Sequence, residues 1–409
     1  MFSTKKSTRI IIVTTITIAI VLSIILLSAE FKVFQNEETT FEAEVERLFK
    51  SVKDKASIIR ELNTTENVEI KVVDSDFFMT KTEENVEDDP LIQIRGTLYK
   101  ALLMVSDDFS LIQKKVEQSG IILAATSGTT LYVNTDYFDP FEEPAKRTLA
   151  HEYAHILQFL NLKKPNINSL DWNIAWTAFI EGEADLLADL FIHDNLLNES
   201  DIHSPTDLGK PSNTKAGWTL DKLFQFPYEY GENFIYKIYL RDGWDGVTEA
   251  YRQLPKSSAQ ILHPEKYFTG FTPLDINNPI PVQIEWDTYY TDTLGEYFLR
   301  TLLIQEISLE RVLDTSSHWV GDNSTIYINK DKYLVYWNIA LDNEESATNL
   351  DEVMIDFFNK MDGIKNGDFW EFSQKFLTSK KSKTSLLLIG SSDKEILEEA
   401  IKNIEDVTS

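Results

Sequence analysis

The chain has 409 residues, 43% of them hydrophobic, which is enough to build a large core and predicts two or three lobes. Its 66 acidic and 39 basic residues give a net charge of −27, which argues against nucleic acid as a partner because such a surface repels phosphates. There is no cysteine, which excludes disulfides, thiolate metal sites, cysteine nucleophiles and a lipidated N-terminal cysteine.

The N-terminal residues predict a membrane anchor. Three basic residues lie within residues 1–9, and residues 10–29 then run without a charge. Twenty such residues can cross a bilayer and exceed the core of an ordinary signal peptide. Because basic flanks stay in the cytoplasm, we expect a single-pass protein of the cell membrane with residues 1–9 as a cytoplasmic tail and the rest outside. The alternative is a signal peptide cleaved near Ala29, where the cleavage motif is poor.

The next hundred residues predict a mixed lobe of helices and strands. Apolar residues at helical spacing predict helices at 41–62, 91–105 and 110–118, and alternating or β-branched runs predict strands at 68–73, 121–125 and 130–133. The acidic, polar stretch 81–90 predicts a loop.

Residues 151–155 read His-Glu-Tyr-Ala-His, an H-E-x-x-H pattern inside an apolar segment without glycine or proline. Positions four apart share one face of a helix, so His151 and His155 can bind one ion. Catalytic zinc sites use three protein ligands and a water, and Glu152 can reach that water as general base. The stretch predicts the zinc-binding helix of a metallopeptidase. The alternative, two surface histidines placed by chance, leaves the carboxylate beside them unexplained.

A second apolar helix, expected within 172–197, supplies the remaining groups. Glu181 and Asp185 lie four residues apart and therefore on one face. Glu181 can complete a site of two histidines and one carboxylate. Asp185 can accept the free N–H of a ligating histidine and fix its tautomer. Glu183 is the alternative ligand, but it points to another face and has Leu187, not an acid, one turn later.

Together, H-E-x-x-H and E-x-x-x-D on a second helix resemble the gluzincin metallopeptidases, the thermolysin-like clan. The resemblance covers about residues 120–270. It implies zinc ligands at His151, His155 and Glu181, a general base at Glu152, and a supporting acid at Asp185. It also implies a zinc cofactor and a peptide or protein substrate.

Departures from related patterns narrow the expected activity. The metzincin pattern is absent, because Gln158 and Asn161 occupy the places of its glycine and third histidine. The G-x-M-E-N loop of aminopeptidases in this clan is also absent, which favours an endopeptidase. In gluzincins the strand before the zinc helix is often a sheet edge that pairs with substrate, and 130–134 is similar in position. An ordinary edge strand is the alternative.

Three further residues are candidates for contacts with substrate. Tyr228 precedes a helix expected at 232–240 and is similar in position to an aromatic that lines gluzincin sites, although aromatic residues in such a stretch more often belong to the core. His263, held extended before a proline, could donate to the oxyanion of a tetrahedral intermediate or simply bind backbone. His318 is a weaker candidate for the same role.

The C-terminal part, 286–409, predicts a smaller mixed α/β lobe in which we find no chemistry. Helices are expected at 291–303, 351–361, 368–377 and 394–404, and strands at 324–328, 333–340 and 383–390. The predicted fold class is therefore α+β: an N-terminal transmembrane helix, a gluzincin-like catalytic domain at 35–285 with a mixed sheet lobe and a helical lobe, and this C-terminal lobe.

The function predicted from the sequence is zinc-dependent peptide hydrolysis by a membrane-anchored, extracytoplasmic metallopeptidase. One alternative is a catalytically inactive peptidase fold that binds peptides at the cell surface. Another is a structural surface protein whose helices only look catalytic. The intact set of histidine, glutamate and aspartate side chains argues against the first alternative, and metal analysis separates the second, which should bind no stoichiometric zinc.

Overall fold

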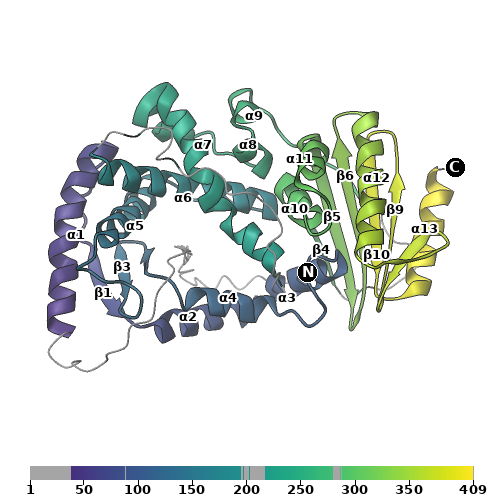
Figure 1. The fold of residues 1–409 in the computed structure, drawn as a ribbon, viewed down its shortest axis with the longest axis horizontal. Helices are drawn as coiled ribbons and strands as arrows, with labels where there is room; N and C mark the ends of the chain where they lie inside the picture. The colour runs from purple at the N-terminus through teal and green to yellow at the C-terminus, as the bar shows by residue number, and fades with distance from the viewer. Residues whose placement is uncertain are drawn as a thin grey trace, which may run out of the picture. The chain divides into compact units, whose positions relative to one another are not determined.

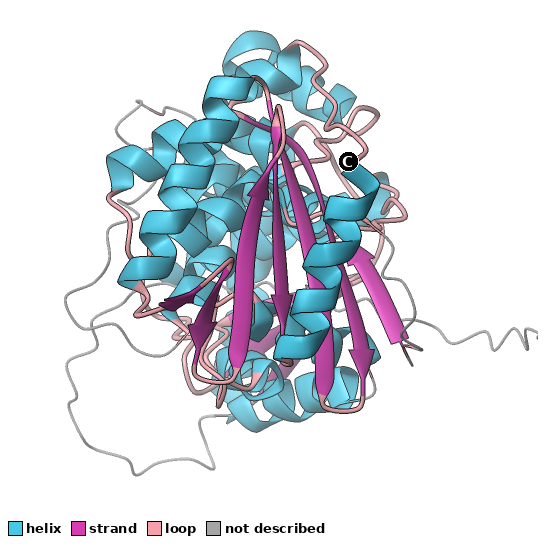
Figure 2. Ribbon diagram, turned by 90° about the vertical axis from the view of Figure 1, so that its right-hand side faces the viewer, coloured by secondary structure: helices cyan, strands magenta, loops and turns pink. Residues whose placement is uncertain are grey.

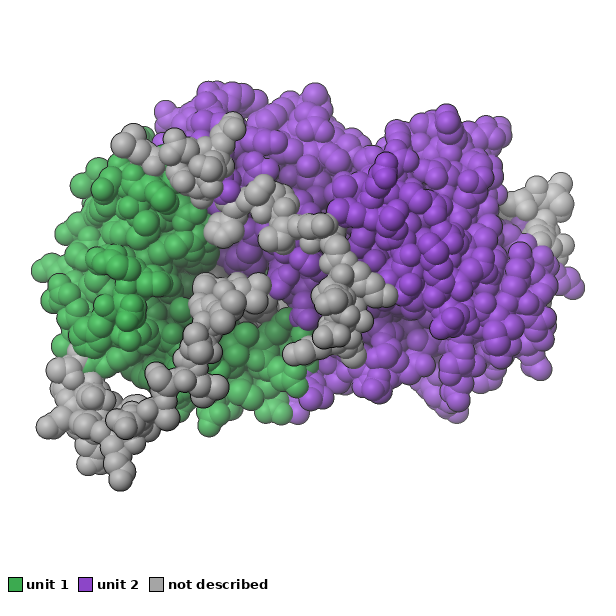
Figure 3. All heavy atoms as spheres, viewed as in Figure 1, with its two compact units in different colours: residues 1–85, 114–164, 183–201 green, residues 86–113, 165–182, 202–409 purple. Residues whose placement is uncertain are grey.

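Residues 38–87, 89–194, 197, 202, 217–279, 286 and 288–408 are described by the structure, a computed structural model (Figure 1). Within them helices and strands are mixed, as the sequence predicts. The chain divides into two compact units (Figure 3): unit 1 holds residues 1–85, 114–164 and 183–201, and unit 2 holds residues 86–113, 165–182 and 202–409. The predicted anchor at 10–29 lies outside the described residues, and no described helix is long and apolar enough to span a membrane.

Unit 1 combines a small sheet with helices. Its elements are α1 (Glu38–Arg60), β1 (Glu69–Val73), most of α2 (Ser75–Glu87) and of α4 (Leu111–Ser119), β2 (Ala124–Ser127), β3 (Thr130–Asn134), α5 (Pro144–Asn161) and the second half of α6 (Leu170–Ile192). The sheet order is β1-β3-β2, with β1 parallel and β2 antiparallel to β3.

Two predictions for unit 1 are wrong. The strand at 130–134 is the central strand of its sheet, not an edge, because β1 pairs with its other side. The edge strand next to α5 is β2 instead. The stretch 81–90 is also not a loop, since α2 continues to Glu87. Buried Phe78, Thr82 and Val86 follow one another at intervals of four on that helix, and the acidic Glu83 and Glu84 between the last two hid this spacing.

Unit 2 contains a seven-stranded antiparallel sheet in the order β4-β5-β6-β10-β9-β8-β7 (Figure 2). Its strands are β4 (Thr288–Asp292), β5 (Trp319–Asn329), β6 (Lys332–Leu341), β7 (Ile364–Asn366), β8 (Phe369–Phe372), β9 (Lys375–Lys381) and β10 (Ser385–Ser391). Its helices are α3 (Pro90–Ala101), the first half of α6, α7 (Trp218–Ala250), α8 (Ser258–Leu262), α9 (Pro264–Phe268), α10 (Gly295–Leu303), α11 (Leu309–Ser317), α12 (Glu344–Lys360) and α13 (Lys394–Thr408).

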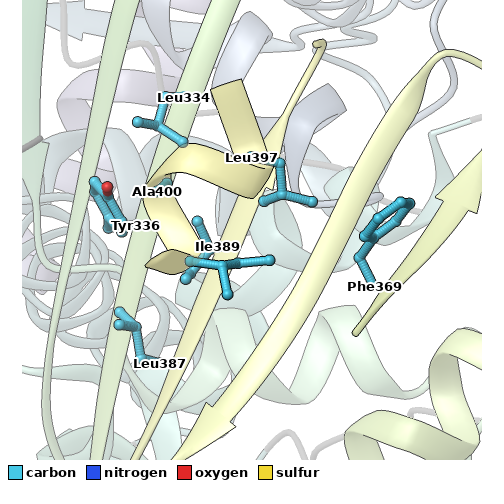
Figure 4. Close-up of a cluster of buried hydrophobic side chains, with 8 residues drawn as sticks. Leu334, Tyr336, Phe369, Leu387, Ile389, Leu397 and Ala400 are labelled. Atoms are coloured by element: carbon cyan, nitrogen blue, oxygen red, sulfur yellow. The ribbon is translucent and has the colours of Figure 1, made fainter. Parts of the chain in front are cut away.

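Helices cover both faces of this sheet. On one face α13 packs on β6 and β10 through a cluster of buried side chains (Figure 4), which includes Leu334, Tyr336, Leu387, Ile389, Leu397 and Ala400. On the opposite face Trp337 packs edge-on against Phe298 of α10, and Trp370 packs against Phe358 of α12. Because neighbouring residues of a strand point to opposite faces, strands covered on both sides read as continuous apolar runs.

That double covering explains one wrong prediction. The stretch 368–377 forms β8 and β9, not a helix, with Ser373 at a positive φ of 54° in the turn between them. Phe369 and Phe376 pack on one face of the sheet and Trp370 packs on the other. The sequence of β8 and β9 therefore lacks the alternation of apolar and polar residues that would distinguish a strand from a buried helix.

A buried carboxyl group at the start of α6 gives unit 2 a predicted pH dependence. Burial raises the pKa of Asp171 to about 8, although hydrogen bonds from the amide and hydroxyl of Ser258 oppose that rise. The nearby carboxyl groups of Asp322 and Glu296 raise it further. Since the folded pKa exceeds the unfolded value, this group's contribution to stability is complete below about pH 4 and is lost as the pH rises through about 8.

Asp171→Asn is therefore expected to stabilise the protein strongly at pH 8 and much less at pH 5. The amide oxygen can still accept from Ser258 but cannot ionise. The expected difference in unfolding free energy between the two pH values is on the order of a few kcal/mol. Thermal unfolding of wild type and variant at both pH values measures it, and an equal shift at pH 5 and pH 8 would contradict the assignment.

Candidate metal centre

Helix α5 presents two imidazoles on one buried face. Pro144 begins the helix, where a missing backbone N–H costs nothing, and the helix runs without interruption to Asn161. His151 and His155 are both buried, and their Nε2 atoms lie 3.1 Å apart. Each Nδ1 faces an acceptor: Asp185 Oδ1 at 3.0 Å for His151 and Gln158 Oε1 at 2.8 Å for His155. Both rings therefore turn their Nε2 atoms toward one point.

Glu181 of α6 completes a three-ligand group. Its carboxylate is fully buried, and one donor atom from each of Glu181, His151 and His155 lies within 4.8 Å of the other two. The boundary between the units falls inside α6, directly after Gly182, but this helix is continuous from Leu170 to Ile192. The helix spacing thus places Glu181 and Asp185 on the same face, as the sequence predicts.

The donor set fits zinc. Zinc–imidazole bonds of about 2.0–2.1 Å at a tetrahedral angle would hold two nitrogens about 3.3 Å apart. The 3.1 Å separation of the Nε2 atoms is close to that value. Two imidazoles and one carboxylate are the ligands of many catalytic zinc sites, whereas calcium and magnesium prefer oxygen alone.

A glycine contact fixes the part of α6 that carries Glu181. A Cβ atom built on Gly182 would lie 2.1 Å from the carbonyl carbon and oxygen of Gly231 in α7. The backbones of the two helices therefore touch directly beside the candidate ligand. Any larger residue at 182 would push α7 away, so the position of Glu181 depends on this close approach.

Asp185 lies where an acid supporting His151 is needed. Its Oδ1 accepts from His151 Nδ1 and from Arg147 at 3.0 Å, and Arg147 also binds Asp189. Burial alone would raise the pKa of Asp185, but the charge of Arg147 and the contact with His151 outweigh it and hold the pKa below its ordinary value. The ionised carboxylate can fix the tautomer of His151 that exposes Nε2.

Glu152 follows His151 in α5, and its carboxylate is held by the sheet of unit 1. Its Oε2 accepts a hydrogen bond of 2.8 Å from the hydroxyl of Thr126 in β2, and the carboxylate is fully buried. Thr126 was not among the residues predicted from the sequence. Only the pairing of β2 with the sheet and its packing on α5 bring it there.

Glu183, the alternative ligand, is engaged elsewhere. Its Oε1 accepts from Arg60 Nε at 2.7 Å and its Oε2 accepts from Gln158 Nε2 at 3.0 Å. These contacts support Glu181 as the ligand. The contact of Arg60 with Glu183 could not be predicted, because nothing in the sequence links the end of α1 to α6, and no feature of the sequence indicates that Gln158 contacts Glu183.

The other three predicted residues belong to unit 2. His263 Nε2 lies 2.9 Å from Glu296 and 3.3 Å from Arg300, within a cluster of charged side chains. Tyr228 is partly exposed inside α7, which begins at Trp218 and includes the stretch expected to precede a helix. His318 follows α11 and binds Asp342 at 2.8 Å. A role for any of them in binding substrate stays a prediction.

Comparisons of the chain with protein-family models, curated proteins and solved structures found no match. The resemblance to gluzincins therefore rests on the motif residues alone.

Proposed function

We propose that this protein is a zinc metallopeptidase that hydrolyses peptide bonds. The observation that carries the proposal is the buried group of His151, His155 and Glu181, with Glu152, whose buried carboxylate Thr126 holds, directly after the first of these residues in the sequence. A peptidase needs an ion and a base side by side, and this arrangement supplies candidates for both.

Each residue then has a role in hydrolysis. Zinc, when bound, would polarise the scissile carbonyl and lower the pKa of a water molecule. Glu152 accepts the proton of that water and delivers it to the leaving amine. Thr126 holds one oxygen of the Glu152 carboxylate, which limits its rotation. Asp185 holds the ring of His151.

The proposal includes a gluzincin-like arrangement of the chain. The catalytic domain would span 35–285, with the C-terminal lobe at 286–409 and the anchor at 10–29. As an edge strand of the unit 1 sheet, β2 can offer backbone N–H and C=O groups to an extended substrate. Recognition through the backbone suits an endopeptidase with a peptide or protein substrate.

Peptide hydrolysis by the purified full-length protein tests the proposal. We expect cleavage of a broad peptide library, loss of cleavage with a metal chelator, and recovery when zinc is added back. Tight zinc binding without any cleavage would favour the alternative of a catalytically inactive peptide-binding protein. Absence of stoichiometric zinc would favour a structural surface protein.

The proposed location makes a separate prediction. If residues 10–29 anchor the chain with residues 1–9 in the cytoplasm, the bulk of the protein lies outside. Protease added to intact cells is then expected to degrade the part after the anchor, while a cytoplasmic marker protein stays intact. Degradation only after lysis would reverse the topology.

A further inference from the structure

A chain of three side chains that are not metal ligands holds the ring of His155. Gln158 Oε1 lies 2.8 Å from His155 Nδ1, Gln158 Nε2 donates to Glu183 Oε2 at 3.0 Å, and Arg60 Nε donates to Glu183 Oε1 at 2.7 Å. All four residues are more than nine-tenths buried. This hydrogen-bond chain lies within unit 1 and runs from Arg60, the last residue of α1, through Glu183 of α6 to Gln158 and His155 of α5.

The donors and acceptors of these side chains allow the hydrogen bonds to run in one direction only. An ionised carboxylate only accepts hydrogen bonds, so Glu183, with Arg60 on one oxygen, presents its other oxygen as an acceptor. Gln158 must therefore turn its NH2 group toward Glu183 and its carbonyl oxygen toward His155. A carbonyl oxygen also only accepts, so the proton of the His155 ring must lie on Nδ1. The lone pair of Nε2 then faces the candidate ion.

We propose that Gln158, Glu183 and Arg60 are positioning residues that set which nitrogen of His155 is protonated and so set the affinity of the site for zinc. The inference rests on the proposed zinc site and adds that a residue of α1 helps to orient one of its ligands. Asp185 orients His151 directly, whereas the ion pair of Arg60 and Glu183 orients His155 through Gln158.

Stability alone is a poor explanation for this arrangement. Removing a carboxylate and a guanidinium from water carries a large desolvation penalty, and well-packed apolar residues in their place are often neutral or stabilising. The Arg60 and Glu183 side chains are 1% and 2% exposed. A buried ion pair that also fixes the direction of a hydrogen-bond chain has a role that apolar residues could not fill.

The first variant reverses the direction of the hydrogen bonds between Glu183 and His155. In Glu183→Gln the new amide turns its oxygen to Arg60, so its NH2 group faces Gln158. Gln158 must then turn its own oxygen to this group and its NH2 toward His155, which favours the proton on Nε2. We expect zinc affinity, measured by competition with a chelator, to fall about ten- to a hundredfold.

A double variant exchanges the two groups. In the double variant Gln158→Glu/Glu183→Gln, the new carboxylate accepts from His155 and from the new amide, whose oxygen accepts from Arg60. The three hydrogen bonds that link Arg60 to His155 and the total charge are retained. We expect the double variant to regain zinc affinity close to that of wild type, although Gln158→Glu alone places two carboxylates side by side and loses affinity.

Lys55→Met is the matched control, because Lys55 also joins α1 to the end of α6. Its Nζ donates to the carbonyl of Phe191 and to Asp194, both at 2.7 Å, without touching the chain to His155. Zinc affinity is expected to stay unchanged. If this control lowers affinity as much as Glu183→Gln does, general loosening of α1 explains the effect and the inference is overturned.

Nitrogen-15 NMR of the metal-free proteins separates this inference from the proposed function. With neutral rings, wild type and the double variant should carry the His155 proton on Nδ1, and Glu183→Gln should carry it on Nε2. The same tautomer in all three proteins, or a double variant that binds zinc no better than Glu183→Gln, would overturn the inference. If wild type binds no zinc but the three proteins show the expected tautomers of His155, the proposed function is wrong, while the orientation of His155 by Gln158, Glu183 and Arg60 is confirmed.

Discussion

Glu152→Gln is expected to keep zinc in the protein while peptide turnover falls about a hundredfold or more, the usual worth of a positioned general base. The amide has the size of the carboxylate and can still accept from Thr126, whose hydroxyl lies 2.8 Å away. It cannot accept a proton at neutral pH. Zinc content by elemental analysis and initial rates on a cleaved peptide, measured on the same preparation, give both halves of the result.

A comparison with Asp185→Asn separates the base from the support of a ligand. Asp185 binds His151 Nδ1 and Arg147, so its loss should lower zinc affinity or activity about ten- to a hundredfold with the base still in place. Excess zinc should restore part of the rate of Asp185→Asn but none of that of Glu152→Gln. Peptide cleavage by Glu152→Gln at the rate of wild type would show that the hydrolytic mechanism is wrong.

Loss of a ligand is expected to empty the site. Wild type should hold about one zinc per chain, and Glu181→Ala or His155→Ala should hold close to none after dialysis. Glu183 does not replace Glu181, because both of its oxygens are engaged by Arg60 and Gln158. Zinc content by elemental analysis, with circular dichroism to check the fold, is the measurement.

Glu143→Ala provides the control for a simple loss of charge. Glu143 precedes α5 and forms an exposed ion pair with Lys146, so its removal should leave zinc content unchanged. Full zinc content in Glu181→Ala would instead rule out Glu181 as a ligand.

The local part of the site could be predicted from the sequence because helix geometry fixes it. Residues four apart on a helix share a face, so the spacing of His151 with His155 and of Glu181 with Asp185 predicted two converging pairs. The structure brings the donor atoms of the first pair and Glu181 within 4.8 Å and places Asp185 on His151. No knowledge of the sheet is needed for that inference.

The parts of the site that depend on long-range packing could not be predicted. Thr126 reaches Glu152 across 26 positions because β2 pairs with β3 and packs on α5. Arg60 reaches Glu183 across 123 positions. Periodicity carries no information on which strands pair or where a helix end lies in space.

The same limit accounts for the errors in the fold. Strands buried on both faces, such as β8 and β9, lack the alternation that distinguishes a strand from a helix. The coarse class of mixed helices and strands was nevertheless predicted correctly, because the long apolar helices and the strands from 319 to 341 carry strong local patterns.

The position of zinc in a crystal of the full-length protein, measured at the zinc absorption edge, decides whether His151, His155 and Glu181 hold the ion. We expect one anomalous peak about 2.0–2.2 Å from His151 Nε2, His155 Nε2 and an oxygen of Glu181. A peak bound through Nδ1 of either histidine, a peak bound to Glu183 in place of Glu181, or no peak at these residues would contradict the account.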